Sequence, residues 1–424
     1  MHEIMSNDLS SAGEDDWHTQ LQALIEAYDW VGVMERIYTN PEEVAVRGYQ
    51  DRRALHIACE HDAPAVVVQA LIAVYPEATS IVGTSNMNPL HITCSSSKAL
   101  LDVVQVLLEG GSGVETSMQD VDGDTPLHTA CRCGAPVDVL ELLLRWNSNV
   151  VHLRDYEGLT PLLRLWVRYY VILGSEAIEA VSAPEQVNGI LSEAWNKTQL
   201  LLKTAYHGLV DLPPGIAFYP VHAAAAVDCP RAVLRIAILL YPEQVELKDN
   251  EGNTPLSVAI NAPIYKVYDL SEDGYDMDRM YEYSDDEPEQ DKNNNEAFQS
   301  QQEVTNVVNC PSVIEVILEK NSHLAKITNN EGRLPLCQAI LKGKSWKDGL
   351  KAIRDAYPDA LSLQDNTTRL FPFMLAAASD VMNPNDNCID TIYRLLKANP
   401  ELARIQPSNQ TIKYDIHRIG KSKI

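Results

Sequence analysis

The sequence predicts an all-α solenoid of stacked helix-turn-helix units with β-turn fingers. Three observations support this prediction: a seven-residue segment recurs through the chain, its copies are evenly spaced, and each copy lies between a turn signature and a second apolar segment. In such an architecture each unit contacts only its neighbours. We therefore expect one stacked array instead of the two or three globular domains that a chain of 424 residues would otherwise suggest.

The recurrent segment is clearest as TPLHTAC at 125–131, NPLHITC at 88–94 and RALHIAC at 53–59. Weaker copies are TPLLRLW at 160–166, YPVHAAA at 219–225, TPLSVAI at 254–260, LPLCQAI at 334–340 and FPFMLAA at 371–377. The third residues of the eight copies are separated by steps of 35, 37, 35, 59, 35, 80 and 37 residues. Five steps lie close to one period, and the other two equal that period plus an insertion.

Each unit has the sequence features of two helix starts. Asp-x-x-Gly turns, in which glycine accepts a positive φ, precede three copies at 120–123, 155–158 and 249–252. A threonine suited to the N-cap and a proline suited to the first helical position follow them, at Thr125, Thr160 and Thr254. About ten residues further on, a second apolar segment begins, with first-turn prolines expected at Pro64, Pro136, Pro230 and Pro311.

This unit of about 35 residues resembles the ankyrin repeat, whose motif is Asp-x-x-Gly-x-Thr-Pro-Leu-His-x-Ala. The segment DVDGDTPLHTA at 120–130 matches that motif at every defined position. The resemblance covers roughly residues 50–406 as about eight repeats, two of them with insertions. It implies stacked helical hairpins with projecting fingers. It also implies that the motif histidines join the fingers by hydrogen bonds, and these are His56, His91, His128 and His222. Other residues at that position predict less regular later fingers, and these are Leu163, Ser257, Cys337 and Met374.

The ends of the chain lie outside the repeats. Residues 17–49 contain two apolar helical segments and are expected to form a helical N-terminal cap, which shields the first apolar face of a solenoid. Residues 1–16 are expected to be disordered. Residues 407–424 are expected to form a basic flexible tail.

Two insertions interrupt the array. The first, at about 167–212, has helical spacing and several aromatic residues; either it lengthens the two helices of the fourth repeat, or it protrudes as a partner-binding knob. The second lies at about 266–305, and residues 269–296 within it hold twelve acidic and two basic residues. Because it has little apolar surface to bury, we expect disorder there. It is either a solvated loop or a docking segment for a basic partner.

Composition excludes several classes of function. The chain has 34 Lys+Arg and 59 Asp+Glu, and its net charge of −25 argues against a nucleic-acid binder with a broad basic face. No apolar run reaches the roughly 18–20 residues that span a bilayer, and the N-terminus lacks a signal peptide pattern. We expect a cytoplasmic monomer with reduced cysteines, with a nuclear location as the alternative. The terminal Ser422-Lys423-Ile424 differs from the peroxisomal Ser-Lys-Leu address in its last residue.

Three His-x-x-Cys pairs superficially resemble metal ligands, namely His56 with Cys59, His91 with Cys94, and His128 with Cys131. Their repetition explains them without a metal. Packed helices lie about 8–10 Å apart, whereas zinc requires ligands about 2 Å from one centre. The sequence also lacks the Gly-x-Ser-x-Gly, His-Glu-x-x-His, phosphate-loop and dinucleotide-binding motifs. We therefore predict no metal, no cofactor and no catalytic activity.

These observations favour a protein-interaction scaffold that binds partner proteins of basic character on the concave face of fingers and helices. The candidate partner-binding residues at the finger tips are Tyr156, Glu157, Asn250, Glu251, Asn330, Glu331 and Asn366. One alternative is an adaptor that delivers a client to a separate enzyme through the helical insertion. The other is an enzyme with a site in residues 167–212, and the surroundings of Trp195, Tyr206 and His207 distinguish the two.

Overall fold

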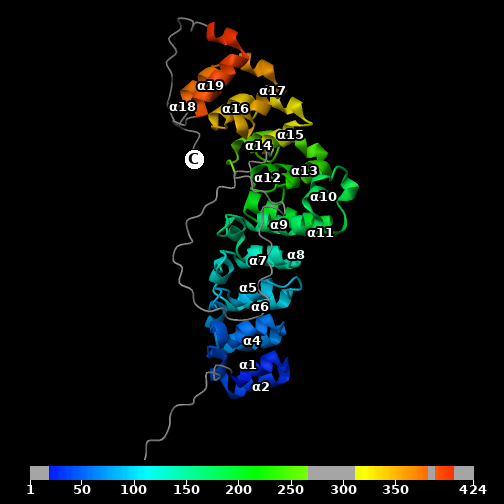
Figure 1. Ribbon diagram of the computed structural model, residues 1–424, viewed down its shortest axis with the longest axis vertical. Coiled ribbons are helices and arrows are strands. Elements are labelled where there is room, and N and C mark those ends of the chain that lie inside the picture. Colours follow the sequence, from blue (N-terminus) through cyan, green and yellow to red (C-terminus); the bar gives the residue numbers. More distant parts are fainter. Residues whose placement is uncertain (1–18, 266–310, 381–386, 405–424) are drawn as a thin grey trace, which may run out of the picture. The chain divides into compact units, whose positions relative to one another are not determined.

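The structure is a computed structural model, and it describes residues 19–265, 311–380 and 387–404 (Figure 1). Its regular secondary structure in this part of the chain is helical. The chain divides into two compact units, of which the first ends at Pro311 and the second begins at Ser312. Three segments assigned from the sequence lie outside the described residues, namely the N-terminus at 1–16, the acidic insertion at about 266–305 and the tail at 407–424. Continuous stacking through residues 50–406 stays a prediction.

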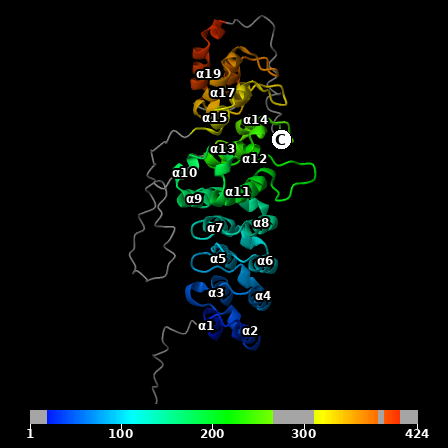
Figure 2. The same ribbon diagram turned by 90° about the vertical axis from the view of Figure 1, so that its right-hand side faces the viewer.

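The first unit is a stack of helical hairpins (Figure 2). Its helices are α1 (Gln20–Glu26), α2 (Trp30–Thr39), α3 (Ala54–Glu60), α4 (Ala65–Val74), α5 (Pro89–Cys94), α6 (Leu101–Gly110), α7 (Pro126–Cys133), α8 (Val137–Trp146), α9 (Pro161–Leu173), α10 (Ser175–Glu179), α11 (Gly189–His207), α12 (Pro220–Ala226), α13 (Arg231–Leu240) and α14 (Pro255–Asn261). The first helices pack in the order α1, α3, α5, α7 and α9, and the second helices in the order α2, α4, α6 and α8. Each hairpin thus buries its apolar residues against its neighbours.

Short 3-10 helices lie in the connections between α-helices. In the first unit they are η1 (Pro41–Ala45), η2 (Tyr49–Asp51), η3 (Pro76–Thr79), η4 (Val114–Ser117), η5 (Ser148–His152), η6 (Pro184–Gln186) and η7 (Pro242–Val245). Four of them begin at proline, whose fixed φ suits the first position of a helical turn. At η3 and η7 a Tyr-Pro pair ends one helix and starts the turn that follows it.

The threonine N-caps are present at three first helices. The Oγ1 atoms of Thr125, Thr160 and Thr254 accept hydrogen bonds from the third residues of α7, α9 and α14 at 3.5, 3.4 and 3.3 Å. None of the four prolines predicted in the first turn of a second helix lies there. Pro64, Pro136 and Pro230 are the N-cap residues of α4, α8 and α13, because the extended ψ of an N-cap is compatible with the fixed φ of proline. Pro311 directly precedes Ser312, the N-cap residue of α15 (Val313–Leu318).

The fourth repeat has unusually long helices. α9 has 13 residues and α11 has 19, whereas α7 and α8 have 8 and 10. Much of the segment at 167–212 therefore prolongs the two helices of this repeat, with α10 between them. The aromatic side chains of Trp166, Tyr169, Tyr170 and Trp195 are buried, and the Trp166 indole donates to Thr198 Oγ1 at 3.0 Å. These aromatics belong to the core, and α11 contacts α8, α9 and α12.

The residues on either side of 266–310 are attached to one place in the first unit. The hydroxyl of Tyr265 donates to the carbonyl oxygen of Ala226 at 3.1 Å. The Nε atom of Arg231 donates to the carbonyl oxygen of Pro311, also at 3.1 Å. Ala226 ends α12 and Arg231 begins α13, so both attachments lie beside the connection between these two helices.

The second unit has five α-helices among its described residues, 312–380 and 387–404. They are α15 (Val313–Leu318), α16 (Pro335–Leu341), α17 (Lys351–Ala356), α18 (Pro372–Asp380) and α19 (Asn387–Ala398), accompanied by η10 (Ser322–Lys326), η11 (Trp346–Leu350), η12 (Pro358–Ser362) and η13 (Pro400–Arg404). α15 packs on α17, α16 on α18, and α18 on α19. The guanidinium groups of Arg354 and Arg394 lie 5.0 and 5.5 Å from the ring centre of Trp346, which is a stabilising cation–π arrangement.

Candidate partner-binding site

Backbone hydrogen bonds join the fingers of the first four repeats. Each bond runs from the tip of one finger to the tip of the preceding one: Thr84 donates to Gln50 at 3.0 Å, Val121 to Ser85 at 3.2 Å, and Tyr156 to Asp122 at 3.1 Å. Backbone donors and acceptors are thereby satisfied across the stack. The finger tips therefore form a continuous surface whose side chains are held in a fixed order.

The motif histidines add a second row of links beneath the tips. Their Nε2 atoms lie close to carbonyl oxygens of the following finger: His56 to Ile81 at 3.0 Å, His91 to Asp124 at 3.0 Å, His128 to Leu159 at 3.2 Å, and His222 to Asn253 at 3.1 Å. Because a carbonyl oxygen can only accept a hydrogen bond, Nε2 carries the proton in each ring. Each histidine thus fixes the finger that follows it.

The other ring nitrogen is engaged as well in the first three histidines. Nδ1 of His56, His91 and His128 accepts from the backbone N–H of the helix N-cap residue at 3.2 to 3.3 Å. Burial lowers the pKa of these three imidazoles to about 4, so they are neutral at pH 7. Both nitrogens are therefore occupied, which leaves neither for a metal. Within the described residues no cluster of three His, Cys, Asp or Glu side chains is arranged to hold a metal ion.

A network of ion pairs connects the third and fourth fingers. Arg164 contacts Asp155 at 2.6 Å, Asp124 at 3.4 Å and Glu157 at 3.2 Å, while Arg132 contacts Asp124 at 3.0 Å. Asp124 and Asp155 are buried, and burial raises the pKa of Asp124 to about 6. No local sequence pattern indicates this network, because the two arginines lie on different helices and their partners on different fingers. These ion pairs hold the third and fourth fingers together.

All seven finger-tip candidates are exposed, and Tyr156 is 72% exposed. Its position depends on the glycine of the preceding finger. Gly123 has a φ of +79°, and a Cβ atom there would lie 2.6 Å from the backbone nitrogen of Tyr156 and 2.7 Å from Cδ1 of its ring. A glycine is required by both the turn and this contact.

Two of the candidates have an internal role that the sequence did not indicate. The Asn250 side-chain amide donates to the carbonyl oxygen of Ala217 at 3.1 Å, and that of Asn366 to the carbonyl oxygen of Gly332 at 2.7 Å. Each amide joins its finger to the preceding one, in the first and the second unit respectively. Their main donors are thus used within the fold, so they are weaker candidates for partner recognition than Tyr156.

The remaining candidates differ in how far their charges are neutralised. Glu331 pairs with Arg333 at 2.9 Å, and Glu251 accepts from the Asn253 amide at 3.4 Å. Asn330 is exposed at the tip of its own finger in the second unit. The structure therefore distributes the candidates over several fingers, and Tyr156 and Glu157 lie next to the finger that carries the exposed Val121.

We define the fingertip patch as Val121, Asp122, Tyr156 and Glu157. All four side chains are exposed, and the backbone hydrogen bond from Tyr156 to Asp122 joins the two fingers that carry them. The patch combines a large aromatic ring, an aliphatic side chain and two carboxylates. Tyr156 and Glu157 were predicted from the sequence. Val121 and Asp122 were not, although they occupy the equivalent turn positions of the preceding finger.

The structure shows the surroundings of the three residues of the helical insertion that distinguish an adaptor from an enzyme. Trp195 is buried, and the Tyr206 hydroxyl donates to Asp249 at 3.1 Å. His207 is partly buried, with its ring centre 4.8 Å from that of Tyr206 and 6.2 Å from that of Phe218. The nearby cavity of about 370 Å³ between α9, α10 and α11 is lined by other, non-ionisable residues.

Comparisons with known proteins agree with the repeat pattern. The family model "Ankyrin repeats (3 copies)" matches residues 90–165, which run from α5 to α9. A search of curated protein sequences finds no match. Among the described residues, no helix is both long and apolar enough to cross a membrane. The total of eight repeats stays a prediction. The matched copies and the helical stack together identify the chain as an ankyrin-repeat protein.

Proposed function

We propose that this protein is a non-catalytic scaffold that binds a partner protein of basic character through the fingertip patch. Ankyrin repeats are generally protein–protein interaction modules and are typically not catalytic. The observation that carries the proposal is the exposed Tyr156 ring on a finger that is hydrogen-bonded to its neighbour, with the exposed Asp122 and Glu157 on the same two fingers. Rigid, partly exposed tyrosines are enriched among the residues that contribute most to binding energy.

Charge supports the choice of partner. Asp122 and Glu157 are both exposed in the patch, although Glu157 also pairs with Arg164, and the chain as a whole carries a net charge of −25. Complementary charge raises the association rate and disfavours partners of like charge, so a basic protein surface fits the patch better than a nucleic acid or an anionic membrane does. We infer that the scaffold works as a monomer.

Cytoplasmic location is part of the proposal. Burial raises the pKa of Cys59, Cys229 and Cys337 to about 12, so these thiols are protonated and unreactive. Buried, protonated thiols fit a reducing compartment.

The adaptor alternative has one specific observation in its favour, which is the apolar cavity in the fourth repeat. An enzymatic site in that segment has less support, because the Tyr206 hydroxyl is engaged by Asp249 and Trp195 belongs to the core. An adaptor would use the fingertip patch for one protein and the cavity for another.

Affinity capture with the full-length chain tests the fingertip patch. The bait is compared with Tyr156→Ala, with Asp122→Lys, and with the control Tyr393→Ala, whose side chain is 62% exposed on α19 of the second unit. We expect a basic protein that the wild type and Tyr393→Ala retain equally and that both patch variants lose at least tenfold. Equal retention by all four baits, or no protein above background with the wild type, contradicts the proposal.

A further inference from the structure

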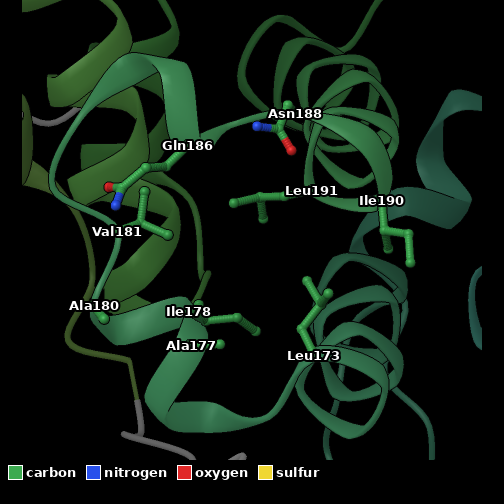
Figure 3. Close-up of a pocket in the computed structure, with 9 residues that line it drawn as sticks. All are labelled: Leu173, Ala177, Ile178, Ala180, Val181, Gln186, Asn188, Ile190 and Leu191. Atoms are coloured by element: carbon green, nitrogen blue, oxygen red, sulfur yellow. The ribbon is translucent and has the colours of Figure 1, made fainter.

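The cavity in the fourth repeat has walls from three helices and one connecting segment. It has a volume of about 370 Å³ and is lined by Leu173, Ala177, Ile178, Ala180, Val181, Gln186, Asn188, Ile190 and Leu191. Figure 3 shows the side chains of Leu173, Ile178 and Leu191 pointing toward the central space from α9, α10 and α11. An engineered cavity of about 150 Å³ binds benzene. This one therefore has room for a large aromatic side chain or for two aliphatic ones.

The two polar side chains in the wall each form hydrogen bonds within the protein. Oε1 of Gln186 accepts from the backbone N–H groups of Ser182 and Ala183 at 2.7 and 2.9 Å. The Asn188 amide donates to the carbonyl oxygen of Glu185 at 2.8 Å. The remaining lining residues are aliphatic. The surface offered to an occupant is thus mainly apolar, which favours burial of a hydrophobic group.

The walls are held in place before any occupant binds. The Tyr170 hydroxyl donates to Glu179 at 3.2 Å, and Glu179 also forms an ion pair with Arg235. These contacts attach α10 to α9 and to α13. Ile178 and Leu191 are 3% and 6% exposed, so they are anchored in the core beneath the cavity. A preformed site loses less conformational entropy on binding than a mobile one.

The segment around the cavity is acidic. Residues 173–193 contain four glutamates and neither lysine nor arginine. Glu179 pairs with Arg235, and Glu193 with Lys197 at 2.7 Å. Glu176 and Glu185 are exposed, adjoin lining residues in the sequence, and have no ion pair within the described part of the chain. Their charge favours a cationic occupant and disfavours anionic ones such as fatty acids.

We propose that this cavity is a docking pocket for a peptide segment of a partner protein, in which an apolar side chain is flanked by lysine or arginine. The apolar side chain fills the space between Leu173, Ile178 and Leu191, and the flanking cations lie near Glu176 and Glu185. None of the lining residues belongs to a finger. The pocket is therefore a second binding site, beyond the fingertip patch of the proposed function.

Three synthetic peptides of twelve residues test the chemistry by fluorescence polarisation with the full-length chain. One has two central leucines flanked by lysines, the second has central alanines with the same lysines, and the third has central leucines flanked by glutamates. We expect the first to bind at least tenfold more tightly than either of the others. Equal binding of the leucine and alanine peptides, or of the lysine and glutamate peptides, overturns the proposal.

Matched variants locate the peptide. Ile190 and Ile172 are 48% and 44% exposed, but only Ile190 lines the cavity. Ile190→Gln and the filling variant Ala177→Phe should each weaken the leucine–lysine peptide at least fivefold, whereas Ile172→Gln should leave it unchanged. Equal effects of the two isoleucine variants contradict the assignment.

Two further variants separate this site from the fingers. The double variant Glu176→Gln/Glu185→Gln should weaken binding several-fold and reduce its dependence on salt. Tyr156→Ala should leave the peptide affinity unchanged. If Tyr156→Ala removes peptide binding instead, the peptide occupies the fingertip patch; the pocket proposal then fails while the proposed function stands.

Discussion

The imidazole of His128 donates from Nε2 to the carbonyl oxygen of Leu159 at 3.2 Å and joins α7 to the next finger. Its Nδ1 atom accepts from the backbone N–H of Thr125 at 3.2 Å. His128→Leu would leave a buried acceptor and a buried donor without partners. Because each such group costs about 1–3 kcal/mol, we expect the free energy of unfolding to fall by about 2–6 kcal/mol.

Urea denaturation followed by circular dichroism measures this loss. His152→Leu is the control, because His152 is exposed in η5. A change below about 0.5 kcal/mol in His128→Leu, the size usual for a surface substitution, would show that the histidine does not link the repeats.

The buried histidines predict a loss of stability in mild acid. The pKa values of His56, His91 and His128 are lowered to about 4 in the fold, whereas an unfolded histidine titrates near 6.5. Between these values the unfolded chain binds more protons than the folded one, so lowering the pH favours unfolding. Between pH 7 and pH 5, each of these histidines should lower the free energy of unfolding by about 2 kcal/mol.

Asp124 acts in the opposite direction. The pKa of the Asp124 carboxyl is raised to about 6, so as the pH falls the folded state binds a proton at Asp124 before the unfolded state does. At pH 5 this should offset about 1 kcal/mol of the stability lost through the histidines. The net expectation is a marked decrease in the denaturation midpoint between pH 7 and pH 5, and a smaller decrease in His128→Leu. A midpoint independent of pH over this range is the outcome that would refute the prediction.

Two glycines with similar backbone conformations should respond differently to alanine. Gly113 and Gly123 have φ values of +89° and +79°. Replacing either by alanine should lower the free energy of unfolding by about 1–2 kcal/mol, because alanine disfavours this left-handed conformation. A Cβ atom at Gly113 meets nothing within 4 Å, whereas one at Gly123 lies 2.6 Å from the nitrogen of Tyr156. Thermal unfolding should therefore be affected at least twice as strongly by Gly123→Ala. Equal shifts would mean that the two fingers do not touch at this point.

The ion pairs of Arg164 and Arg145 should contribute unequally. Arg164 is almost buried between Asp155 and Asp124, while Arg145 is 45% exposed beside Glu141. Removing one partner of a buried pair leaves an uncompensated charge and costs about 3–5 kcal/mol. An exposed pair contributes about 0–1 kcal/mol. We expect Arg164→Leu to destabilise strongly and Arg145→Leu to have little effect.

Combination with Asp155→Asn provides the check. If the network exists in solution, the double variant Arg164→Leu/Asp155→Asn should be less destabilised than the sum of the two single variants. Additive losses in urea denaturation would indicate that Arg164 and Asp155 do not interact.

Local sequence features determined much of the fold in advance. Thr125 and the proline after it form an N-cap and a first helical turn whatever surrounds them, because the partners lie within three residues. The repeat period then orders the hairpins. Pro64 was predicted in the first turn of α4 but is its N-cap residue, because the fixed φ of proline suits both positions.

The site was only partly predictable, because its decisive contacts join distant residues. Asn250 reaches Ala217 across 33 positions, and no local pattern distinguishes this amide from a free turn residue. The apolar cavity depends in the same way on how α10 lies between α9 and α11, since Leu173, Ile178 and Leu191 meet only in three dimensions. Sequence could place these residues on helices but could not indicate the space between them.

The attachments of Tyr265 and Pro311 beside the α12–α13 connection allow the segment between these two residues to vary in length. Because the chain leaves and rejoins the first unit at one place, the length of the segment between these residues is not constrained by the geometry of the stack. Loop-closure entropy varies only slowly with length, by about 0.6 kcal/mol for each doubling. This position is therefore a natural point of evolutionary variation and a suitable place to introduce a foreign domain.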